Sequence, residues 1–202
     1  MIEQMNAWQS LKELFKLDSA QIDLLTKYVD LLLHENTKTN LTGFKTVEDQ
    51  ISMNLHDSIQ LTKYLNLDNK VVVDVGSGAG IPGLALAMTT KCHMHLLEIR
   101  EKRIRFLKQM TNELLLKNVI VDERDWLTFL RTKKFKVDYY LARASLQPEE
   151  LIKGLNYDPA TVIYWASVDW QANDNIKNFI VRDELYAVAQ KERRLIFFAN
   201  RK

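Results

Sequence analysis

Cysteine is nearly absent from this 202-residue chain, and Cys92 alone cannot form an internal disulfide. A secreted disulfide scaffold is therefore excluded, and a reducing compartment is expected. No apolar run approaches the ~18 residues that a membrane span needs. The first residues, MIEQMNAWQS, lack the basic and apolar regions of a signal peptide. We expect a cytoplasmic protein without membrane contact.

The chain also lacks a strong excess of charge of one sign. Its formal net charge is +2, which by itself does not indicate a nucleic-acid partner. Basic residues are clustered, however, in residues 100–108 (REKRIRFLK), 131–136 (RTKKFK) and 192–194 (ERR). Such clusters can form a strip that faces phosphates, or simply a solvated helix face. They support an RNA partner without establishing one.

Only three prolines are present, and no Pro/Gly-rich linker marks a domain break. Residues 1–65 have apolar residues at steps of three and four, which predicts an N-terminal helical extension. The first such face contains Trp8, Leu11, Leu14 and Phe15, and the second contains Ile22, Leu25, Val29 and Leu32. Asp18 and Gln21 have the spacing of a capping box, and Thr46 indicates another helix start.

Residues 66–202 alternate short β-rich runs with helical ones, which predicts a parallel sheet covered on both faces. The last two runs are separated by only a few residues, so they must pair antiparallel. The expected fold is therefore α/β, the Rossmann-like class I fold of S-adenosylmethionine-dependent methyltransferases. The predicted strands are 71–75, 93–99, 118–123, 137–143, 161–167 and the final pair 178–188 and 192–200.

Glycine is scarce, yet four of the six glycines lie between positions 76 and 83. Gly78, Gly80 and Gly83 fit the dinucleotide pattern G-x-G-x-x-G, whereas Gly76, Gly78 and Gly80 fit G-x-G-x-G. In a nucleotide-binding loop the first glycine follows the strand directly, and here that residue is Gly76. S-adenosylmethionine is thus favoured, with a nicotinamide cofactor as the alternative. Asp74, Ser77 and the three glycines are the predicted cofactor-binding residues of this loop.

Other residues near the loop agree with a nucleoside cofactor. Pro82 suits the first turn of a helix, whose N-terminus favours a carboxylate. No lysine follows the last glycine, which excludes a Walker-type phosphate loop. Glu98 lies 24 positions after Asp74 and could accept the ribose hydroxyls or cap the next helix. Asp125 could accept from the adenine amino group, with Trp126 as an apolar wall, or act as an N-cap.

A metal site is not expected. His93 and His95 alternate with Cys92 and Met94 along a predicted strand, as ligands can do. No second pair of ligands stands at zinc spacing, so packing or surface roles are favoured.

Seven motifs stand out along the chain: Asn40-Leu41-Thr42, Asp57-Ser58, DVGSGAGIPGLALA (74–87), LLE (96–98), KRIRFL (102–107), Ala142-Arg143-Ala144 and ERRLIFFANRK. Together they resemble the bacterial 16S ribosomal RNA N7-guanine methyltransferases, the glucose-inhibited division protein B family. The resemblance covers nearly the whole chain and implies S-adenosylmethionine as donor and a guanine of the small ribosomal subunit as acceptor. It implies cofactor contacts at Gly76, Ile81, the 125–126 pair and Arg143. Arg143 is also the predicted catalytic residue, because it could orient the guanine, with a structural salt bridge as the alternative.

The chain departs from this family at three places. Glu98-Ile99 replaces the usual Asp-Ser, Asn54 stands where histidine is common, and Ala166-Ser167 replaces Lys-Gly. The lost lysine removes a contact to phosphate or base. A paralogue acting on another RNA or a small molecule, or a cofactor-binding protein without turnover, is therefore an alternative.

The implied reaction needs no general base, because guanine N7 has a free lone pair. Rate would come from orientation, which can contribute ~7–11 kcal/mol.

A monomer is expected. The predicted phosphate contacts are Lys102, Arg103, Arg105 and Lys108. The candidates for stacking on the base, with core packing as the alternative role, are Tyr139, Tyr140, Tyr164 and Trp165.

Overall fold

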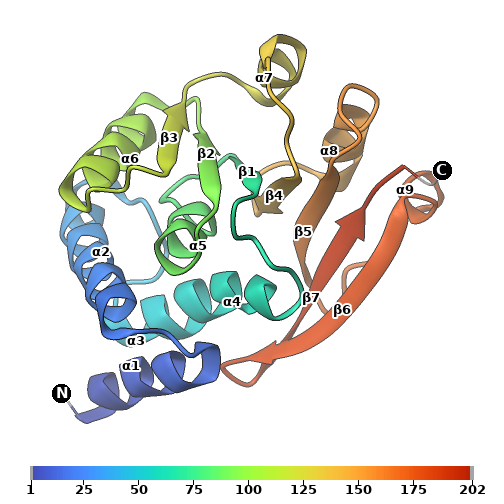
Figure 1. Ribbon diagram of the computed structural model, residues 1–202. Coiled ribbons are helices and arrows are strands. Elements are labelled where there is room, and N and C mark those ends of the chain that lie inside the picture. The colour runs from blue at the N-terminus through green and yellow to red at the C-terminus, as the bar shows by residue number, and fades with distance from the viewer. Residues whose placement is uncertain (1, 201–202) are drawn as a thin grey trace.

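The protein is built around one seven-stranded sheet with the strand order β3-β2-β1-β4-β5-β7-β6. The structure, a computed structural model, describes residues 2–200, with side chains from residue 7 onward (Figure 1). The first five strands are parallel, and β7 pairs antiparallel with both β5 and β6. The predicted α/β sheet with a C-terminal antiparallel hairpin is confirmed. The strands are β1 (Val71–Val75), β2 (His93–Leu97), β3 (Val119–Asp122), β4 (Tyr139–Arg143), β5 (Thr161–Ser167), β6 (Ile180–Val188) and β7 (Lys191–Phe198).

Helices connect the parallel strands, as the alternation of β-rich and helical runs predicts. Proline occupies the start of α8, where its missing N–H costs no hydrogen bond. In α5, by contrast, Pro82 stands at the N-cap, and the helix begins at Gly83. The helices are α1 (Ile2–Phe15), α2 (Ser19–Thr39), α3 (Val47–Asp49), α4 (His56–Ile59), α5 (Gly83–Thr89), α6 (Glu101–Glu113), α7 (Trp126–Thr132), α8 (Pro148–Gly154) and α9 (Asp174–Lys177).

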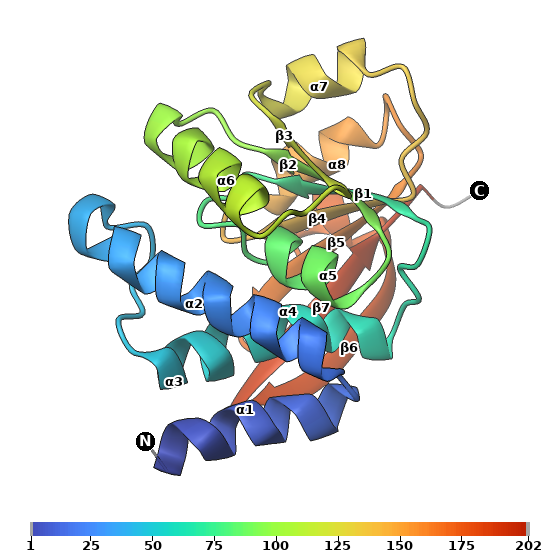
Figure 2. The same cartoon turned by 60° about the vertical axis from the view of Figure 1, so that its left-hand side comes forward.

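Both faces of the sheet are buried, and alternate strand residues point to different cores. On one face, Val72, Leu96 and Leu141 pack with the N-terminal helices, α5 and α6. On the other, Val73 and Ala142 pack with α7 and α8. Figure 2 shows α2, α5 and α6 on one side of the strands and α7 and α8 on the other. The sheet is therefore covered on both faces, as the runs of apolar strand residues predict.

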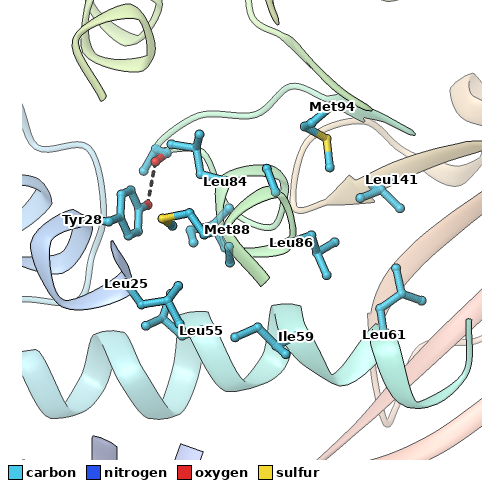
Figure 3. Close-up of a cluster of buried hydrophobic side chains, with 14 of the residues drawn as sticks. Leu25, Tyr28, Leu55, Ile59, Leu61, Leu84, Leu86, Met88, Met94 and Leu141 are labelled. Atoms are coloured by element: carbon cyan, nitrogen blue, oxygen red, sulfur yellow. Dashed lines mark hydrogen bonds between the residues drawn. The ribbon is translucent and has the colours of Figure 1, made fainter. Parts of the chain in front are cut away.

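The N-terminal helical extension shares the first core instead of forming a core of its own. Leu25 and Tyr28 of α2 lie against Leu84 and Met88 of α5 (Figure 3). The Tyr28 hydroxyl donates to the Ala79 carbonyl at 2.7 Å, which ties the extension to the glycine loop. The boundary near residue 65 stays a prediction, and the two segments pack as one unit.

The predicted helix starts are confirmed by their caps. The Asp18 carboxylate accepts from Gln21 N–H, and the Gln21 side chain accepts from Asp18 N–H, which completes a capping box. The Thr46 hydroxyl accepts from Asp49 N–H. The predicted face of α1 was wrong in one detail, because Leu14 is exposed while Leu11 is buried.

An unpredicted π-helical segment, η1 (Gln50–Leu55), leads into α4 and a 3-10 turn, η2 (Gln60–Lys63). It carries buried polar side chains toward the sheet: Asn54 is buried here, and Asp57 and Ser58 follow in α4. π-Helical segments often lie at functional sites. This one faces the carboxyl end of β4, where parallel α/β sheets present ligands.

Candidate active site

The glycine loop turns sharply away from the carboxyl end of β1. Gly76, Gly78 and Gly80 have φ angles of 73°, 59° and 89°, in the left-handed region that favours glycine. Gly83 instead opens α5, where an added Cβ would lie 2.7 Å from Asp74 Oδ2. The three conformationally demanding glycines are thus those of the G-x-G-x-G register, with Gly76 directly after the strand.

Asp74 and Ser77 hold the loop through hydrogen bonds to its backbone. Asp74 Oδ2 accepts from Gly83 N–H at 3.0 Å, and Ser77 Oγ donates to the Asp74 carbonyl at 2.9 Å. The Ser77 carbonyl in turn accepts from the N–H groups of Gly80 and Ile81. Ile81 is buried in the core below the loop. These three predicted cofactor residues shape the loop, and direct contact with the cofactor stays a prediction.

Burial gives Asp74 an unusual titration. Desolvation raises the pKa of its carboxyl from 3.8 to about 7, and the bond from Gly83 N–H opposes this rise. Between these two values the folded protein holds a proton that the unfolded chain has lost. The contribution of this protonated carboxyl to the free energy of unfolding is therefore fully present below about pH 4, and it is lost as the pH rises to about 7.

We expect Asp74→Asn to remove this pH dependence, because asparagine keeps an acceptor for Gly83 N–H but does not titrate. From pH 5 to 7, the unfolding free energy of the wild type should fall relative to that of the variant by about 2–3 kcal/mol, at roughly 1.4 kcal/mol per pH unit. Urea unfolding at several pH values measures this difference. Asp23→Asn, at an exposed aspartate of α2, is the matched control. Parallel curves for wild type and Asp74→Asn would contradict the assignment.

Glu98 links the glycine loop to the start of α6. Its Oε2 accepts from Gly78 N–H at 3.0 Å, and its Oε1 accepts from the N–H groups of Ile99 and Arg100, both at 2.9 Å. The carboxylate is 4% exposed and lies 3.5 Å from Arg103 Nη1. Glu98 thus orders the turn into α6, as its alternative interpretation proposed, and it also lines the neighbouring cavity.

A cavity of about 330 Å³ opens beside this turn at the carboxyl ends of β1 and β2. Ile99 and Leu127, which are 64% and 41% exposed, give it two apolar walls. Of the predicted cofactor residues, it brings together Gly76, Glu98, Asp125 and Trp126. The lining that sequence reasoning missed is Val75, Leu97, Ile99, Arg124, Leu127, Leu146, Glu150 and Lys153. For Ile99 the signal was available, because it directly follows Glu98.

The side chains of the pair after β3 are held by contacts within the protein. Asp125 is the N-cap of α7: its Oδ1 accepts from Thr128 N–H at 3.0 Å and its Oδ2 from the Thr128 hydroxyl at 2.6 Å. These bonds lower the pKa of the Asp125 carboxyl. The Trp126 ring is buried against Gly154 of α8, where an added Cβ would lie 2.4 Å from it. The ring is therefore part of the core while Trp126 also lines the cavity beside Ile99 and Leu127, and its role as an apolar wall for adenine stays a prediction.

Arg143, at the carboxyl end of β4, is held by residues of the π-helical segment and of α4. Its Nε donates to Asp57 Oδ2 at 2.8 Å, its Nη1 to Asn54 Oδ1 at 3.0 Å, and its Nη2 to the Met53 carbonyl at 2.9 Å. Asp57 is fully buried and also accepts from the Tyr186 hydroxyl at 2.6 Å. The salt-bridge interpretation of Arg143 is therefore realised, and its role toward cofactor or guanine stays a prediction.

Comparison with known proteins decides the family. A family model described as GidB, rRNA small subunit methyltransferase G, matches residues 21–165. The chain belongs to the GidB family. A ribosomal RNA small subunit methyltransferase G of Pectobacterium atrosepticum is 31% identical over 173 residues, which are 84% of this chain and 78% of that protein. The protein of the same name from Nitrosococcus oceani is 40% identical over 111 residues, or 54% and 51% of the two chains. The latter match thus spans about half of the relative's length.

Solved structures agree on the fold. A crystal structure of magnesium protoporphyrin IX methyltransferase from Synechocystis with bound S-adenosylmethionine matches with a TM-score of 0.59, at 15% identity. The match covers 86% of this chain and 97% of that one. The class I methyltransferase fold predicted from the sequence is confirmed, and so is the resemblance to the GidB family. A GidB-family chain of this fold is an S-adenosylmethionine-dependent methyltransferase.

The departures from the usual GidB residues have visible structural consequences. Asn54 replaces the common histidine and accepts from Arg143 while its amide donates to Gln50 Oε1 at 2.6 Å. Ala166 is buried, and Ser167 lies at the end of β5 opposite Arg193 of β7. Arg193 Nη2 is 3.6 Å from Asp57 Oδ2. A cation from the hairpin thus stands near the strand end where the family usually has lysine.

The four cations predicted to meet RNA phosphates lie on α6 but are not equivalent. Arg103 pairs with Glu98, Arg105 with Glu101 at 3.4 Å, and Lys108 with Glu123. Lys102 is exposed and forms no ion pair within the described residues. The structure thus leaves Lys102 as the member of this set with no carboxylate to compete with a phosphate.

The aromatic candidates for stacking divide between core and surface. Tyr140 and Trp165 are buried, with the Tyr140 hydroxyl bonded to Asp158 and the Trp165 indole N–H bonded to the Asp57 carbonyl. Core packing is therefore their role. Tyr139 and Tyr164 are half-buried. Tyr164 packs among Trp170 and Phe198, and Tyr139 packs against the first core, so neither offers a free stacking face in this arrangement.

Of the two histidines of β2, His93 is exposed and His95 has a packing role. His95 stacks on Phe135 with ring centroids 4.6 Å apart, and burial lowers the pKa of its imidazole. Among the residues that the structure describes, no three His, Cys, Asp or Glu side chains gather closely enough to hold a metal ion. In the same part of the chain, no helix combines the length and hydrophobicity required to cross a bilayer.

Proposed function

We propose that this protein transfers a methyl group from S-adenosylmethionine to N7 of a guanine in 16S ribosomal RNA of the small ribosomal subunit. The observation that carries the proposal is the cavity beside the glycine loop in a chain of the GidB family. Relatives named ribosomal RNA small subunit methyltransferase G support the RNA acceptor. The N7 position and the guanine come from the motif resemblance.

The cavity fits the adenosine part of the donor. Ile99 and Leu127 provide apolar surfaces for the faces of the adenine ring. Glu98 Oε2 accepts from one N–H group and has a lone pair for a ribose hydroxyl. Gly76 also lines the cavity and presents only backbone atoms to it. When bound, S-adenosylmethionine supplies an electrophilic methyl group on a positively charged sulfur.

Transfer of this methyl group needs orientation more than acid–base chemistry. The N7 lone pair forms the new N–C bond as the S–C bond breaks, and the positive charge passes from sulfur to the guanine. No proton is removed, so the transfer needs no general base. Alignment of two bound reactants can supply ~7–11 kcal/mol of the barrier reduction.

We propose that Arg143 positions the acceptor from the neighbouring strand end. Three of its five N–H groups are bonded to Asp57, Asn54 and the Met53 carbonyl, which fixes the plane of the guanidinium. The remaining N–H groups can donate to guanine O6, or to the donor carboxylate. The basic face of α6, with Lys102 its unpaired member, would approach phosphates, so binding should weaken steeply with salt.

A second candidate is a methyltransferase of the same fold with another RNA or a small molecule as acceptor. The observation in its favour is Ala166-Ser167, which removes the usual lysine after β5. The donor side would be the same in both cases. The two candidates therefore differ only in the methyl-acceptor molecule that binds at the carboxyl ends of β4 and β5.

Methyl transfer from labelled donor distinguishes these candidates. Purified protein should label small subunits or naked 16S RNA from a strain without its own GidB-family enzyme, and digestion should yield 7-methylguanosine. Identical RNA already methylated by an active family member is the matched control and should accept no label. Label in a different nucleoside, in another RNA or in small metabolites would contradict the 16S guanine proposal. A protein that binds donor but transfers to none of these acceptors would contradict both.

A further inference from the structure

The Tyr28 hydroxyl is a direct contact between the N-terminal helical extension and the glycine loop. Tyr28 is fully buried on α2, where its ring packs with Leu84 and Met88 of α5 (Figure 3). Its hydroxyl donates to the Ala79 carbonyl at 2.7 Å. Burial raises the pKa of this hydroxyl, so it stays a neutral donor at physiological pH. Tyr28 does not line the cavity, so it can act on a ligand only through the loop.

The peptide group that Tyr28 holds has unusual rotational freedom. Ala79 lies between Gly78 and Gly80, whose φ angles are 59° and 89°. Because Gly80 has no Cβ, the Ala79–Gly80 peptide can rotate with little steric hindrance. Two hydrogen bonds oppose this rotation: Gly80 N–H donates to the Ser77 carbonyl at 2.7 Å, and the Ala79 carbonyl accepts from Tyr28. The first bond lies within the loop, whereas the second comes from the helical extension.

The orientation of this peptide is connected to the cavity wall. Gly78 N–H, one residue before Ala79, donates to Glu98 Oε2 at 3.0 Å, and Glu98 lines the cavity. Gly76, at the start of the same loop, lines it as well. A rotation of the Ala79–Gly80 peptide therefore moves a segment that is bonded directly to the cavity wall.

Helix α2 is a fixed support for the Tyr28 hydroxyl. Gln21 Nε2 donates to the carbonyl of Thr89, the last residue of α5, at 2.9 Å. Lys27 Nζ donates to the carbonyl of Glu113, the last residue of α6, at 2.8 Å. These bonds join α2 to the two helices that begin at the glycine loop and after β2. The tyrosine thus acts from a helix that is itself anchored to both sides of the loop.

We propose that Tyr28 is a positioning residue for the methyl donor. Its hydroxyl holds the Ala79–Gly80 peptide, and through it the glycine loop, in the orientation that binds S-adenosylmethionine. The helical extension is then required for donor binding, although none of its described residues lines the cavity. This inference rests on the donor half of the proposed function and is independent of the acceptor.

Tyr28→Phe tests the inference, because it keeps the buried ring and removes the hydroxyl from the Ala79 carbonyl. By calorimetry, the variant should bind S-adenosylhomocysteine about fivefold or more weakly than the wild type, because fewer molecules have the loop in its binding orientation. With labelled donor, the KM for the donor should rise to the same extent. The kcat at saturating donor and the KM for RNA should stay within about twofold, a division that a general loss of stability would not produce.

The matched control is Tyr140→Phe, which removes another buried hydroxyl, one that donates to Asp158 Oδ2 at 2.7 Å. Both variants should unfold at a lower temperature than the wild type, but the control should bind S-adenosylhomocysteine within about twofold of the wild type. Amide hydrogen exchange gives a second readout. In the ligand-free protein, Gly80 N–H should exchange faster in Tyr28→Phe and at the wild-type rate in the control.

Unaltered S-adenosylhomocysteine affinity in Tyr28→Phe would overturn the inference and leave the proposed function standing. An equal loss of affinity in Tyr140→Phe would also overturn it, since the loss would then follow from lower stability. If Tyr28→Phe weakens donor binding but the wild type methylates no guanine of 16S RNA, the inference holds and the proposed function fails. A wild type that does not bind S-adenosylhomocysteine would defeat both.

Discussion

Replacement of Asp57 by alanine will lower the free energy of unfolding by about 3–5 kcal/mol, the cost of removing one member of a buried ion pair. Asp57 is fully buried, and its carboxylate meets Arg143, Arg193 and the Tyr186 hydroxyl. The variant leaves two partly buried guanidinium groups without their anion. Because these partners come from β4, β6 and β7, the loss loosens the attachment of the N-terminal helices to the sheet.

Urea unfolding of Asp57→Ala beside Asp23→Ala measures this effect, since Asp23 is exposed on α2. The control should change the free energy of unfolding by less than about 0.5 kcal/mol. Asp57→Asn, which keeps the shape and one of the two acceptor oxygens, covers the case in which the alanine variant does not fold, and its loss should be intermediate. Similar free energies of unfolding for Asp57→Ala and the control would show that the contacts of Asp57 with Arg143, Arg193 and Tyr186 contribute no stability.

The sequence predicts the sheet well because the information there is local. The five parallel strands have continuous apolar runs, and the short separation of the last two leaves antiparallel pairing as their one option. The glycine register was also predictable, since it depends on which glycine follows the strand. Caps at Asp18 and Thr46 depend on residues three positions apart. In each of these cases the residues that decide the structure are neighbours in the chain.

The hydrogen bonds around Arg143 and Asp57 could not be predicted, because they join residues that are far apart in the chain. Arg143 and Asp57 are separated by 86 positions, and Tyr186 and Asp57 by 129. Their contact depends on the π-helical segment, whose sequence QISMNL carries no distinctive signal. For the same reason the hydrogen bond between Glu98 and the glycine loop became visible only in three dimensions.

The predicted roles of Asp125 and Trp126 show a different limit. A carboxylate before a helix can be an N-cap or a ligand contact, and the residue type is the same for both. In the structure Asp125 caps α7 and also lines the cavity, so the two interpretations are compatible. Trp126 turns inward because Gly154 of α8 leaves room for its ring, a contact that local sequence does not encode.

Gly76→Ala is the second variant with a large expected effect, and here the effect is on function. Gly76 has a φ of 73°, and its added Cβ would lie 2.7 Å from Ser145 Cβ, closer than side-chain carbons approach. The loop or the turn after β4 must therefore shift. Since a displacement of ~1 Å can cost about 10²-fold in rate, we expect methyl transfer to fall by about 10²-fold and donor affinity to fall with it.

A double variant shows whether the clash causes this loss. Gly76→Ala combined with Ser145→Gly removes the Ser145 Cβ, so part of the activity should return, although the left-handed backbone still costs about 1–2 kcal/mol. Gly43→Ala is the matched control, because its added Cβ meets nothing within 4 Å, and its activity should equal that of the wild type. Labelled methyl transfer and calorimetry with S-adenosylhomocysteine measure all four proteins. Wild-type donor affinity in Gly76→Ala would mean that the donor does not depend on this loop, and the proposed orientation of the methyl group would lose its structural basis.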